Sequence, residues 1–363
     1  MIDLNQVVTA LQSVIDPNSN LSIVNAKLVS QLKTEGNNIF FELDVTNIIG
    51  DMRSKVFAAA QEEIKKMLPG SEVHIHMKSD APNAPKTNSV LPQVKNIIAV
   101  ASGKGGVGKS TVSVNTALAL VQQGYKVGLI DADLYGPSIP TMLDIQNERP
   151  KIKEVYGKHK IIPVEAHGLF TISIGLIIEP EKAVVLRGPR LSGVIKQFIN
   201  ECIWPDLDYL IIDLPPGTGD IQLTLVQTVP ITGVVMVTTP QKVAVIDAVK
   251  AMNMFLLSNI NVPILGVIEN MSWFSPDDEP SKKYLIFGEG GGRKLAEMNQ
   301  TELLGQVPLV QKIREAGDEG KPLVGQDDNI VKSSFDKIVT NLIQQVNSRN
   351  ETIDPTQIVH VSK

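Results

Sequence analysis

The sequence predicts an α/β protein with a doubly wound, mostly parallel sheet, preceded by a small α+β domain. Three observations support this prediction. From Asn96 onward, apolar runs of strand length alternate with segments whose apolar residues have helical spacing. These runs are continuous rather than alternating, which is typical of strands that helices cover on both faces. The chain before residue 79 has a different pattern, and a proline-containing stretch separates it from the rest.

The composition is that of a globular protein with more than one domain. The chain has 363 residues, of which 43% are hydrophobic and 20% charged, and this length suggests two or more domains. No apolar run approaches the roughly 18–20 residues that a membrane span needs. The formal net charge of −5 disfavours nucleic acid as a partner, and the single cysteine, Cys202, fits a reducing compartment. We therefore expect a cytoplasmic protein that binds neither membrane nor nucleic acid.

Residues 1–78 have the pattern of a small α+β domain. Their apolar spacing predicts, in order, helix 7–15, strands 21–32 and 39–45, helix 53–68 and strand 73–77. Pro69-Gly70 closes the second helix. His74 and His76 alternate with apolar residues in the last strand, and we expect them to be a pair of surface histidines. Residues 79–93 contain three prolines and few large apolar groups, which predicts a linker.

Residues 94–348 have the pattern of a parallel sheet with helical crossovers, and residues 349–363 form the expected C-terminal tail. The expected strands span residues 97–101, 127–130, 169–174, 209–212, 234–237 and 264–268. The expected helices include residues 109–123, 192–201 and 243–258. Apolar residues near helical spacing between 330 and 346 predict one more segment packed on the sheet, whereas the chain from Ser348 to Pro355 is neither basic nor helical in pattern.

A glycine-rich loop follows the first expected strand of this larger domain. It reads Gly-x-x-x-x-Gly-Lys-Ser, the pattern of a P-loop that cradles phosphates. Glycines allow tight turns that point backbone N–H groups inward, and the helix that starts near Lys109 directs its dipole at the phosphates. Lys109 would neutralise phosphate oxygens and the Ser110 hydroxyl would bind Mg²⁺. The residues predicted to bind nucleotide in this loop are Gly103, Lys104, Gly105, Gly106, Val107, Gly108, Lys109, Ser110 and Thr111.

The same loop also fits a rival motif. From residue 103 it reads G-x-G-x-x-G, the dinucleotide fingerprint of a Rossmann oxidoreductase, and Asp131 ends the next strand at the spacing of a ribose-binding acid. Two features favour the P-loop. Lys109-Ser110-Thr111 places a cation and hydroxyls where a Rossmann helix needs neither, and Asp213 ends an apolar strand as a Walker B acid does. The sequence therefore predicts a P-loop NTPase.

Acidic and amide side chains follow the expected strands at the edge where parallel sheets bind ligands. Asp213 is expected to hold Mg²⁺ through a water, and it opens the switch candidate DLPPGTGD, in which the N–H of Gly217 would follow the γ-phosphate. Asp131 and Asp133 follow the second strand, where either acid could instead cap the next turn. Asn270 follows the last expected strand, where an amide can contact an adenine edge or cap a loop.

Together these motifs resemble the Mrp/ApbC family of iron–sulfur cluster carrier ATPases, within the deviant Walker A P-loop class that includes MinD and ParA. The similar segments within residues 97–325 are KGGVGKST, DADLYGPSIP, LRGP, DLPPGTGD, IENMS and IREAGDEGKPLV. Residues 1–78 resemble the MIP18-type domain that often precedes such an ATPase, with VIDP and LPG as matching pieces. The resemblance covers nearly the whole chain.

The resemblance implies a homodimeric ATPase that uses ATP and Mg²⁺ to deliver iron–sulfur clusters. Its partners would be iron–sulfur assembly proteins or recipient apoproteins. In the deviant class Lys104 reaches across the dimer interface to the partner's nucleotide, Asp133 orients the attacking water, and Asp131 belongs to the magnesium shell. The resemblance also favours the adenine contact for Asn270. The implied catalytic residues are Lys104, Lys109 and Asp133, and the implied magnesium ligands are Ser110, Asp131 and Asp213.

The chain departs from the family at its cluster ligands. The family's Cys-x-x-Cys after the Asn-Met-Ser segment is replaced by WFSPDDEP, and TNIIG stands where the small domain usually has a cysteine. Clusters are commonly held by four thiolates, whereas a homodimer of this chain offers only two copies of Cys202, which we expect to be buried and inert. Asp277, Asp278 and Glu279 are hard oxygen ligands that match iron–sulfur chemistry poorly. No Fe–S ligand is therefore identifiable.

Two other functions stay open at this point. An ATP-switched adaptor or scaffold without its own cluster would use residues 1–78 to bind assembly partners. A positioning ATPase of the MinD/ParA kind would bind membrane or DNA through basic surfaces. The acidic chain and its C-terminal segment provide neither feature, which disfavours this last interpretation.

Overall fold

The computed structural model describes residues 2–45, 48, 52–78, 90–155, 157–177, 188–276, 278–279, 282–325, 330–353, 356 and 358. It divides into two compact units. The first unit comprises Met1–Thr87, Ile152–Ile161 and Ile203–Asp206, and the second comprises Asn88–Lys151, Ile162–Cys202 and Leu207–Lys363. Most of the expected linker lies outside the described residues, and the domain boundaries at residues 78, 93 and 348 stay predictions.

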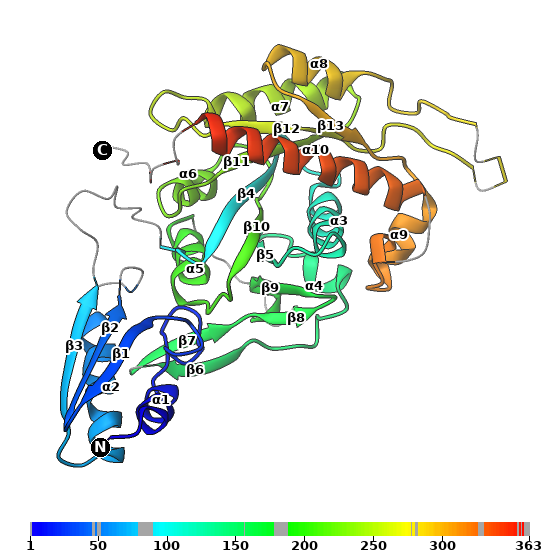
Figure 1. The fold of residues 1–363 in the computed structure, drawn as a ribbon. Helices are drawn as coiled ribbons and strands as arrows, with labels where there is room; N and C mark the ends of the chain where they lie inside the picture. Colours follow the sequence, from blue (N-terminus) through cyan, green and yellow to red (C-terminus); the bar gives the residue numbers. More distant parts are fainter. Residues whose placement is uncertain are drawn as a thin grey trace. The chain divides into compact units, whose positions relative to one another are not determined.

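The smaller unit contains a three-stranded sheet of order β1-β2-β3 (Figure 1). The central strand β2 (Asn38–Asp44) pairs antiparallel with β1 (Val29–Glu35) and parallel with β3 (Glu72–Lys78). Buried and half-buried residues alternate along β2, so its buried side chains pack in one core with α1 (Leu4–Gln12) and α2 (Met52–Met67). The predicted small α+β fold is confirmed.

The first strand of this unit is shorter than predicted. It begins at Val29 rather than at Leu21, because residues 23–27 form turns. The Ser22 hydroxyl accepts the backbone N–H of Asn25 at 3.1 Å, and side chains that bond the nearby backbone compete with a strand ladder. The apolar residues of this stretch therefore gave a misleading strand signal.

The first helix also differs from its predicted bounds. α1 spans Leu4–Gln12 rather than residues 7–15. The Asp3 carboxylate accepts the N–H of Asn5 at 2.9 Å and caps the helix one turn earlier than the apolar spacing indicates. The remaining predicted elements of this unit have their expected type and place.

The larger unit is built on an eight-stranded sheet of order β13-β12-β11-β4-β10-β5-β9-β8. Neighbouring strands of this sheet pair in parallel, except that β8 is antiparallel to β9. The six strands that we predicted are β4 (Val94–Ser102), β5 (Val127–Asp131), β9 (Leu169–Ser173), β10 (Leu207–Asp213), β11 (Gly233–Thr238) and β12 (Ile264–Glu269). The doubly wound, mostly parallel sheet is confirmed.

The strands that the sequence did not predict are short. β8 (Val164–Ala166) and β13 (Leu303–Gln306) lie at the two edges of the large sheet, and β6 (Lys151–Val155) pairs with β7 (Lys158–Ile162) in a separate two-stranded sheet. A run of three to five residues carries too little apolar pattern to stand out as a strand.

Helices cover the large sheet (Figure 1). α3 (Lys109–Gln122) packs on β4, β5 and β10 and contacts α10 (Ile330–Thr352), which packs on β12 and β13. α7 (Lys242–Phe255) packs on β4 and β11 and contacts α8 (Gly291–Met298), which packs on β12. The remaining helical segments are α4 (Ile139–Met142), η1 (Ile174–Leu176), α5 (Gly188–Glu201), α6 (Asp220–Val226), α9 (Gln311–Asp318) and η2 (Leu323–Gly325).

Helix α10 confirms one prediction and corrects another. Its first part packs on the sheet as expected for residues 330–346. The prediction that the chain is not helical from Ser348 onward is wrong, because α10 continues to Thr352. Arg349 explains the difference: it is buried and follows Leu342 and Val346 on the inner face at helical spacing. Because Arg349 is charged, the apolar pattern does not include it, although it is the last buried residue of this helix face. Its guanidinium donates to the Thr356 hydroxyl at 2.7 Å.

Every helix in the described part of the chain is too short or too polar to span a bilayer.

Candidate functional site

The expected site residues meet at the carboxyl ends of three neighbouring strands. β10 pairs with β4 on one side and with β5 on the other, and Asp213 lies directly opposite Asp131 in the register. The glycine-rich loop leaves the end of β4 and leads into α3 at Lys109. Because parallel strands present their carboxyl ends at one edge, side chains that are distant in sequence converge there.

The loop backbone requires glycine at three positions. Gly106 and Gly108 have φ of +81° and +78°, a region that L side chains rarely adopt. Gly103 has ordinary φ, but a Cβ there would collide with the backbone of Asp247 and Ala248 in α7. The loop therefore turns tightly against α7 and ends at the amino terminus of α3, where free N–H groups and the helix dipole favour an anion.

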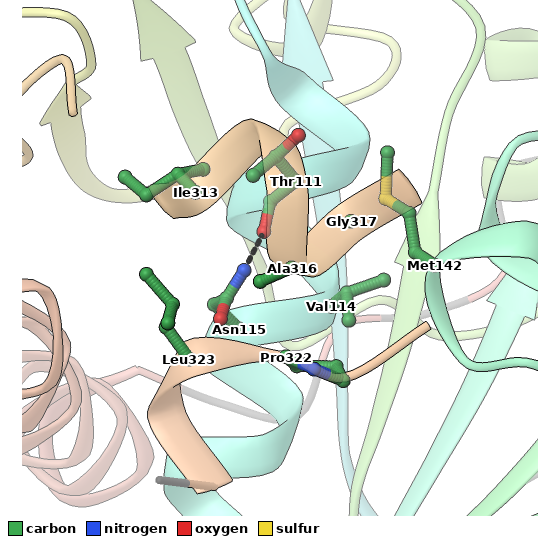
Figure 2. A pocket seen from close by; sticks show the side chains of 9 residues that line it. All are labelled: Thr111, Val114, Asn115, Met142, Ile313, Ala316, Gly317, Pro322 and Leu323. Atoms are coloured by element: carbon green, nitrogen blue, oxygen red, sulfur yellow. Dashed lines mark hydrogen bonds between the residues drawn. The ribbon is translucent and has the colours of Figure 1, made fainter. Parts of the chain in front are cut away.

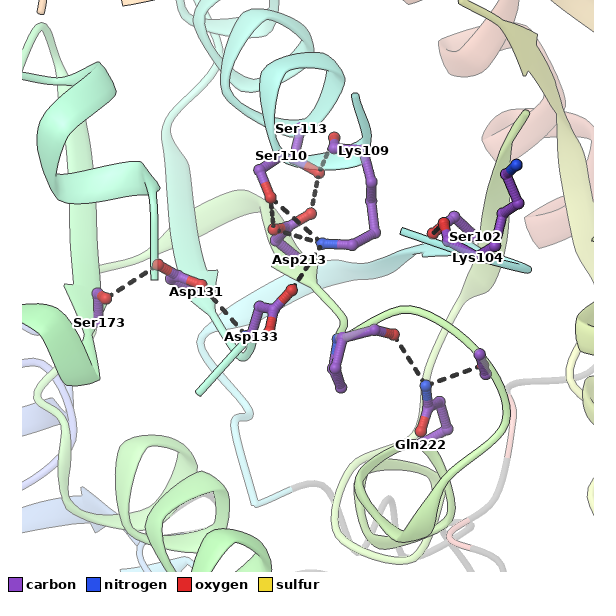
Figure 3. A network of polar contacts seen from close by, with 12 residues as sticks. Ser102, Lys104, Lys109, Ser110, Ser113, Asp131, Asp133, Ser173, Asp213 and Gln222 are labelled. Carbon is purple, nitrogen blue, oxygen red and sulfur yellow. Dashed lines mark hydrogen bonds and ion pairs between the residues drawn. The ribbon is translucent and has the colours of Figure 1, made fainter. Parts of the chain in front are cut away.

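A buried hydrogen-bond network lies beneath this loop (Figure 3). The Lys109 Nζ donates to Asp213 Oδ2 at 2.7 Å, and the Ser110 hydroxyl donates to the same oxygen at 2.6 Å. The Ser113 hydroxyl donates to the other carboxylate oxygen, Oδ1, at 2.6 Å. Asp213 has 0% exposure, so its charge is balanced by one ammonium and two hydroxyl donors in the absence of water contact. Three predicted residues are thus brought together as expected.

The two acids after β5 lie beside this network. Asp131 accepts the Ser173 hydroxyl at 2.9 Å and the N–H of Asp133 at 3.2 Å. Burial, together with the negative charge of Asp213, raises the pKa of Asp131 to about 8. Burial also raises the pKa of Asp133, although Lys109, whose Nζ lies 3.9 Å from Asp133 Oδ2, opposes this rise. Both acids therefore lie within the electrostatic reach of Asp213 and Lys109.

Lys104 stands apart from these contacts. Figure 3 shows its side chain directed away from Lys109 and the carboxylates. Its backbone carbonyl accepts the Ser102 hydroxyl at 3.1 Å, while its ammonium forms no ion pair with any residue that the structure describes. The backbone of Lys104 is therefore held in place, while its ammonium is directed away from this site.

The loop after Asp213 is braced by a side chain that the sequence analysis did not identify. The amide nitrogen of Gln222 donates to the carbonyls of Pro215 and Gly217 at 2.9 and 3.0 Å, and its oxygen accepts the N–H of Gly219 at 2.9 Å. The expected role of the Gly217 N–H differs in this structure, because that group donates to the carbonyl of Ser102 at 2.9 Å. It contacts a phosphate only if this bond breaks.

Asn270, which follows β12, contacts the glycine-rich loop at Val107 and Gly108. Its Nδ2 donates to the carbonyl of Val107 at 2.8 Å, and its own backbone N–H donates to Thr238 at 2.8 Å. The expected adenine contact of Asn270 stays a prediction. The structure adds that one amide hydrogen is already bonded to the loop itself.

The segment IREAGDEGKPLV packs beside the last residue of the loop. Figure 2 shows a pocket on the flank of α3 where Thr111 and Asn115 face Ile313 and Ala316 of α9 and Leu323 of η2. The carbonyl of Thr111 accepts the Asn115 amide at 2.8 Å. This family segment therefore supports the first turn of α3. Leu186 and Arg187 of the LRGP segment lie outside the described residues.

Three side chains that orient residues of the site were not predicted from the sequence, although the spacing on α3 could have indicated one of them. Ser113 lies one helical turn after Lys109, so spacing on α3 could have placed it on the same face. Ser173 and Gln222 carry no such local signal, because each meets its partner only through the packing of β9 on β5 or the folding of the Asp213 loop.

Thiol and histidine ligands do not gather at a metal site in the described chain. Cys202 is buried, as expected. No group of three or more His, Cys, Asp or Glu side chains is arranged to hold a metal ion within the described ranges. His74 and His76 are exposed on β3, as predicted, and His74 stacks on Phe40 at 4.7 Å between ring centroids.

The segment that replaces the family's Cys-x-x-Cys is held by backbone pairing and cation–π contacts. Phe274 forms isolated bridges with Tyr284 and Leu309. The Lys283 ammonium lies 4.2 Å from the ring centroid of Trp273, within the range of a cation–π contact. Asp278 and Glu279 are exposed, while Asp277 and most of TNIIG lie outside the described residues.

Comparisons with known proteins show the family of this chain. A family model described as NUBPL iron-transfer P-loop NTPase matches residues 93–345, and one described as iron-sulfur cluster assembly protein matches residues 4–75. An iron-sulfur cluster carrier protein of Synechocystis is 42% identical over 350 residues, which cover 95% of this chain and 97% of the relative. One of Escherichia coli is 54% identical over 235 residues, which cover 64% of this chain and 61% of the relative.

A solved structure is also similar to this chain. A nucleotide-binding protein from Archaeoglobus fulgidus, in complex with ADP, has a TM-score of 0.56 and 34% identity, covering 64% of this chain and 88% of that chain. The resemblance inferred from the motifs is thereby confirmed. The chain belongs to the NUBPL-type iron-transfer P-loop NTPase family, with an iron–sulfur cluster assembly domain before the NTPase.

Proposed function

We propose that this chain binds and hydrolyses ATP with Mg²⁺ and couples that cycle to the delivery of iron–sulfur clusters. The observation that carries the proposal is the buried contact of Lys109 and Ser110 with Asp213 beneath the glycine-rich loop. A cation, a hydroxyl and a carboxylate meet there at the amino terminus of α3. Phosphoryl transfer uses these three kinds of group to bind phosphate and magnesium.

The side chains at this edge suit magnesium. Mg²⁺ prefers oxygen ligands and is commonly held by one or two carboxylates together with substrate phosphates. Ser110 and Asp213 would hold the ion, and Asp131 would contribute to its shell. The ion would neutralise charge on the phosphates. Lys109 would exchange its bond to Asp213 for the phosphate oxygens, which leaves Asp213 available to orient a magnesium-bound water.

Asp133 is the proposed residue for positioning the attacking water. It lies 3.9 Å from the Lys109 ammonium and is only partly exposed. An oriented acid next to the phosphate site can hold a water in line for attack and accept its proton. Lys104 is proposed to act in a homodimer, on the partner subunit's nucleotide, because its ammonium is directed away from the site of its own chain.

The iron–sulfur cluster is the proposed cargo, and the family membership supports it. One buried cysteine per chain cannot supply the four thiolates that commonly hold a cluster. Recipient apoproteins, assembly proteins or small thiols would therefore supply the missing ligands. The same observation favours a second candidate, a nucleotide-switched scaffold that binds these partners through residues 1–78 and holds no cluster. Either function would operate in the cytoplasm.

Hydrolysis is tested by phosphate release with Mg²⁺ and with EDTA. Lys109→Ala and Asp133→Ala should abolish turnover, whereas Lys312→Ala, at an exposed position of α9, should match the wild type. Wild-type rates in either site variant would contradict the proposal.

Cluster binding is tested by anaerobic reconstitution with iron and sulfide, desalting, and assay of iron and acid-labile sulfide per dimer. Retained cluster in the wild type and in Cys202→Ala alike would mean that ligands other than Cys202 complete the site. No retained cluster in a protein that hydrolyses ATP would favour the scaffold over the carrier.

A further inference from the structure

Asn270 connects the end of β12 to the middle of the phosphate loop. Its Nδ2 donates to the carbonyl of Val107 at 2.8 Å across a separation of 163 residues. Asn270 is 6% exposed and Val107 is 2% exposed, so water does not compete for this bond. The adjacent backbone N–H of Asn270 is bonded to Thr238, which fixes the position from which the amide reaches the loop.

Close packing accompanies this hydrogen bond. A Cβ added at Gly108 would collide with Nδ2 of Asn270. At the opposite end of the loop, a Cβ at Gly103 would collide with the backbone of α7. The loop is thus clamped at its first glycine by α7 and at its last glycine by Asn270.

The strand end that carries Asn270 is itself anchored. Glu269 has 0% exposure, and its carboxylate accepts the N–H of Gly292 in α8 and the Gln306 amide, the latter at 2.7 Å. The Glu269 carbonyl accepts the Ser272 hydroxyl at 2.8 Å and the N–H of Val307 at 2.9 Å. Asn270 therefore acts on the loop from a rigid support rather than from a mobile turn.

The direction of this bond has a consequence for phosphate binding. In a trans peptide the carbonyl of one residue and the N–H of the next point in opposite directions. Holding the Val107 carbonyl toward Asn270 therefore aims the N–H of Gly108 to the other side of the loop. An anion-binding loop needs its N–H groups aimed together at the phosphate, and glycine at positive φ leaves this peptide plane easy to rotate without an anchor.

We propose that Asn270 is a positioning residue for the phosphate loop, which acts on nucleoside triphosphates regardless of their base. The proposal rests on the proposed nucleotide-binding function. It makes a prediction opposite to that of the adenine contact. A base-reading amide contributes to ATP alone, whereas an amide that aligns Gly108 contributes equally to every ligand that carries the triphosphate.

The test measures the affinity of the full-length protein for Mg²⁺-ATP, Mg²⁺-GTP and Mg²⁺-tripolyphosphate. Tripolyphosphate has no base, so it reports on the loop only. Asn270→Ala removes the donor, and the nearly isosteric Asn270→Asp faces the Val107 carbonyl with an acceptor. In both variants we expect the dissociation constants of all three ligands to rise by a similar factor, about 10-fold for the loss of one buried hydrogen bond. The ratio between ATP and GTP should stay within about 2-fold of the wild-type ratio.

Asn299→Ala is the matched control. Asn299 also donates an amide N–H to a backbone carbonyl, that of Leu295 at 2.9 Å, but it lies at the carboxyl end of α8, outside the loop. It should leave all three affinities unchanged, which separates a general loss of packing from misalignment of the loop.

Two results would overturn the proposal. A loss of affinity for ATP alone, with GTP and tripolyphosphate unchanged, would make Asn270 a base-reading residue. Unchanged affinity for all three ligands in a folded Asn270→Asp protein would show that the bond to Val107 does not align the loop. If the wild type binds none of the ligands, the proposed function fails instead.

Discussion

Lys109 Nζ lies 2.7 Å from Asp213 Oδ2, and these two side chains are 6% and 0% exposed. The lysine proposed to bind phosphate and the acid proposed to hold Mg²⁺ thus neutralise one another. Removing one member of such a pair leaves a buried charge with an incomplete set of donors, which is more costly than losing a surface ion pair.

Lys109→Ala should therefore lose stability as well as ATP hydrolysis. We expect the nucleotide-free variant to unfold with a free energy about 3 kcal/mol lower than the wild type, because Asp213 keeps only hydroxyl donors. Lys104→Ala is the matched control within the same loop, since the ammonium of Lys104 pairs with no described acid. It should stop turnover and leave denaturant unfolding unchanged. Equal stability of the two variants would contradict this account.

Ser113→Ala should weaken the magnesium site without removing any predicted ligand. Ser113 is fully buried and orients Asp213 through Oδ1. Loss of this bond should cost about 1–2 kcal/mol of unfolding free energy and should raise the Mg²⁺ concentration that gives half-maximal turnover. Ser334→Ala removes a hydroxyl that donates to the carbonyl of Ile330 within α10 and should change neither quantity. A variant with wild-type magnesium dependence would argue against Asp213 as a ligand of the ion.

Asp133→Asn should separate binding from hydrolysis. The asparagine keeps the size of the side chain but cannot accept the proton of an attacking water. We expect turnover to fall by about 100-fold or more, while the affinity for Mg²⁺-ATP stays close to wild type. If the variant loses both turnover and affinity for Mg²⁺-ATP, Asp133 contributes to nucleotide binding rather than to positioning the attacking water.

Asp131 should make the metal-free protein less stable as the pH rises. Burial and the charge of Asp213 raise its folded-state pKa from 3.8 to about 8, so between these values the unfolded chain has released a proton that the folded protein retains. Because the folded state binds more protons, its stability falls as pH increases through this range and is highest below it. Asp131→Asn should remove this slope in unfolding experiments with EDTA. An unchanged slope would place the pH dependence elsewhere.

Gly305→Ala should destabilise the edge of the large sheet. A Cβ at this position in β13 would lie 2.5 Å from Cγ1 of Ile338 in α10. The resulting overpacking should cost about 1–3 kcal/mol. Gly193→Ala, in α5 with nothing within 4 Å of the added Cβ, should instead stabilise the protein by about 0.5–1 kcal/mol, because alanine favours the helix. A loss of stability at Gly193 would contradict the steric explanation.

Six strands of the large sheet and the glycine-rich loop could be recognised from the sequence. Continuous apolar runs located six strands of the large sheet, and the KGGVGKST segment located the glycine-rich turn before α3, because both signals lie between near neighbours in the chain. Acids at strand ends were placed at one edge by the parallel-sheet rule alone. In the small unit, an apolar run from Leu21 predicted a strand, but the hydrogen bond between the Ser22 hydroxyl and the N–H of Asn25 stabilises a turn there instead.

Tertiary structure alone decided which side chains meet. The bonds from Lys109 to Asp213 and from Asn270 to Val107 span 104 and 163 residues, so they depend on strand order and on close backbone approach at Gly108. The same holds for Arg349, whose charge conceals its burial on α10 from an analysis of apolar spacing. Periodicity reports how a segment divides its own faces between core and solvent. It carries no information about which distant segment packs against that face. The geometry of the site depends on contacts between such distant segments.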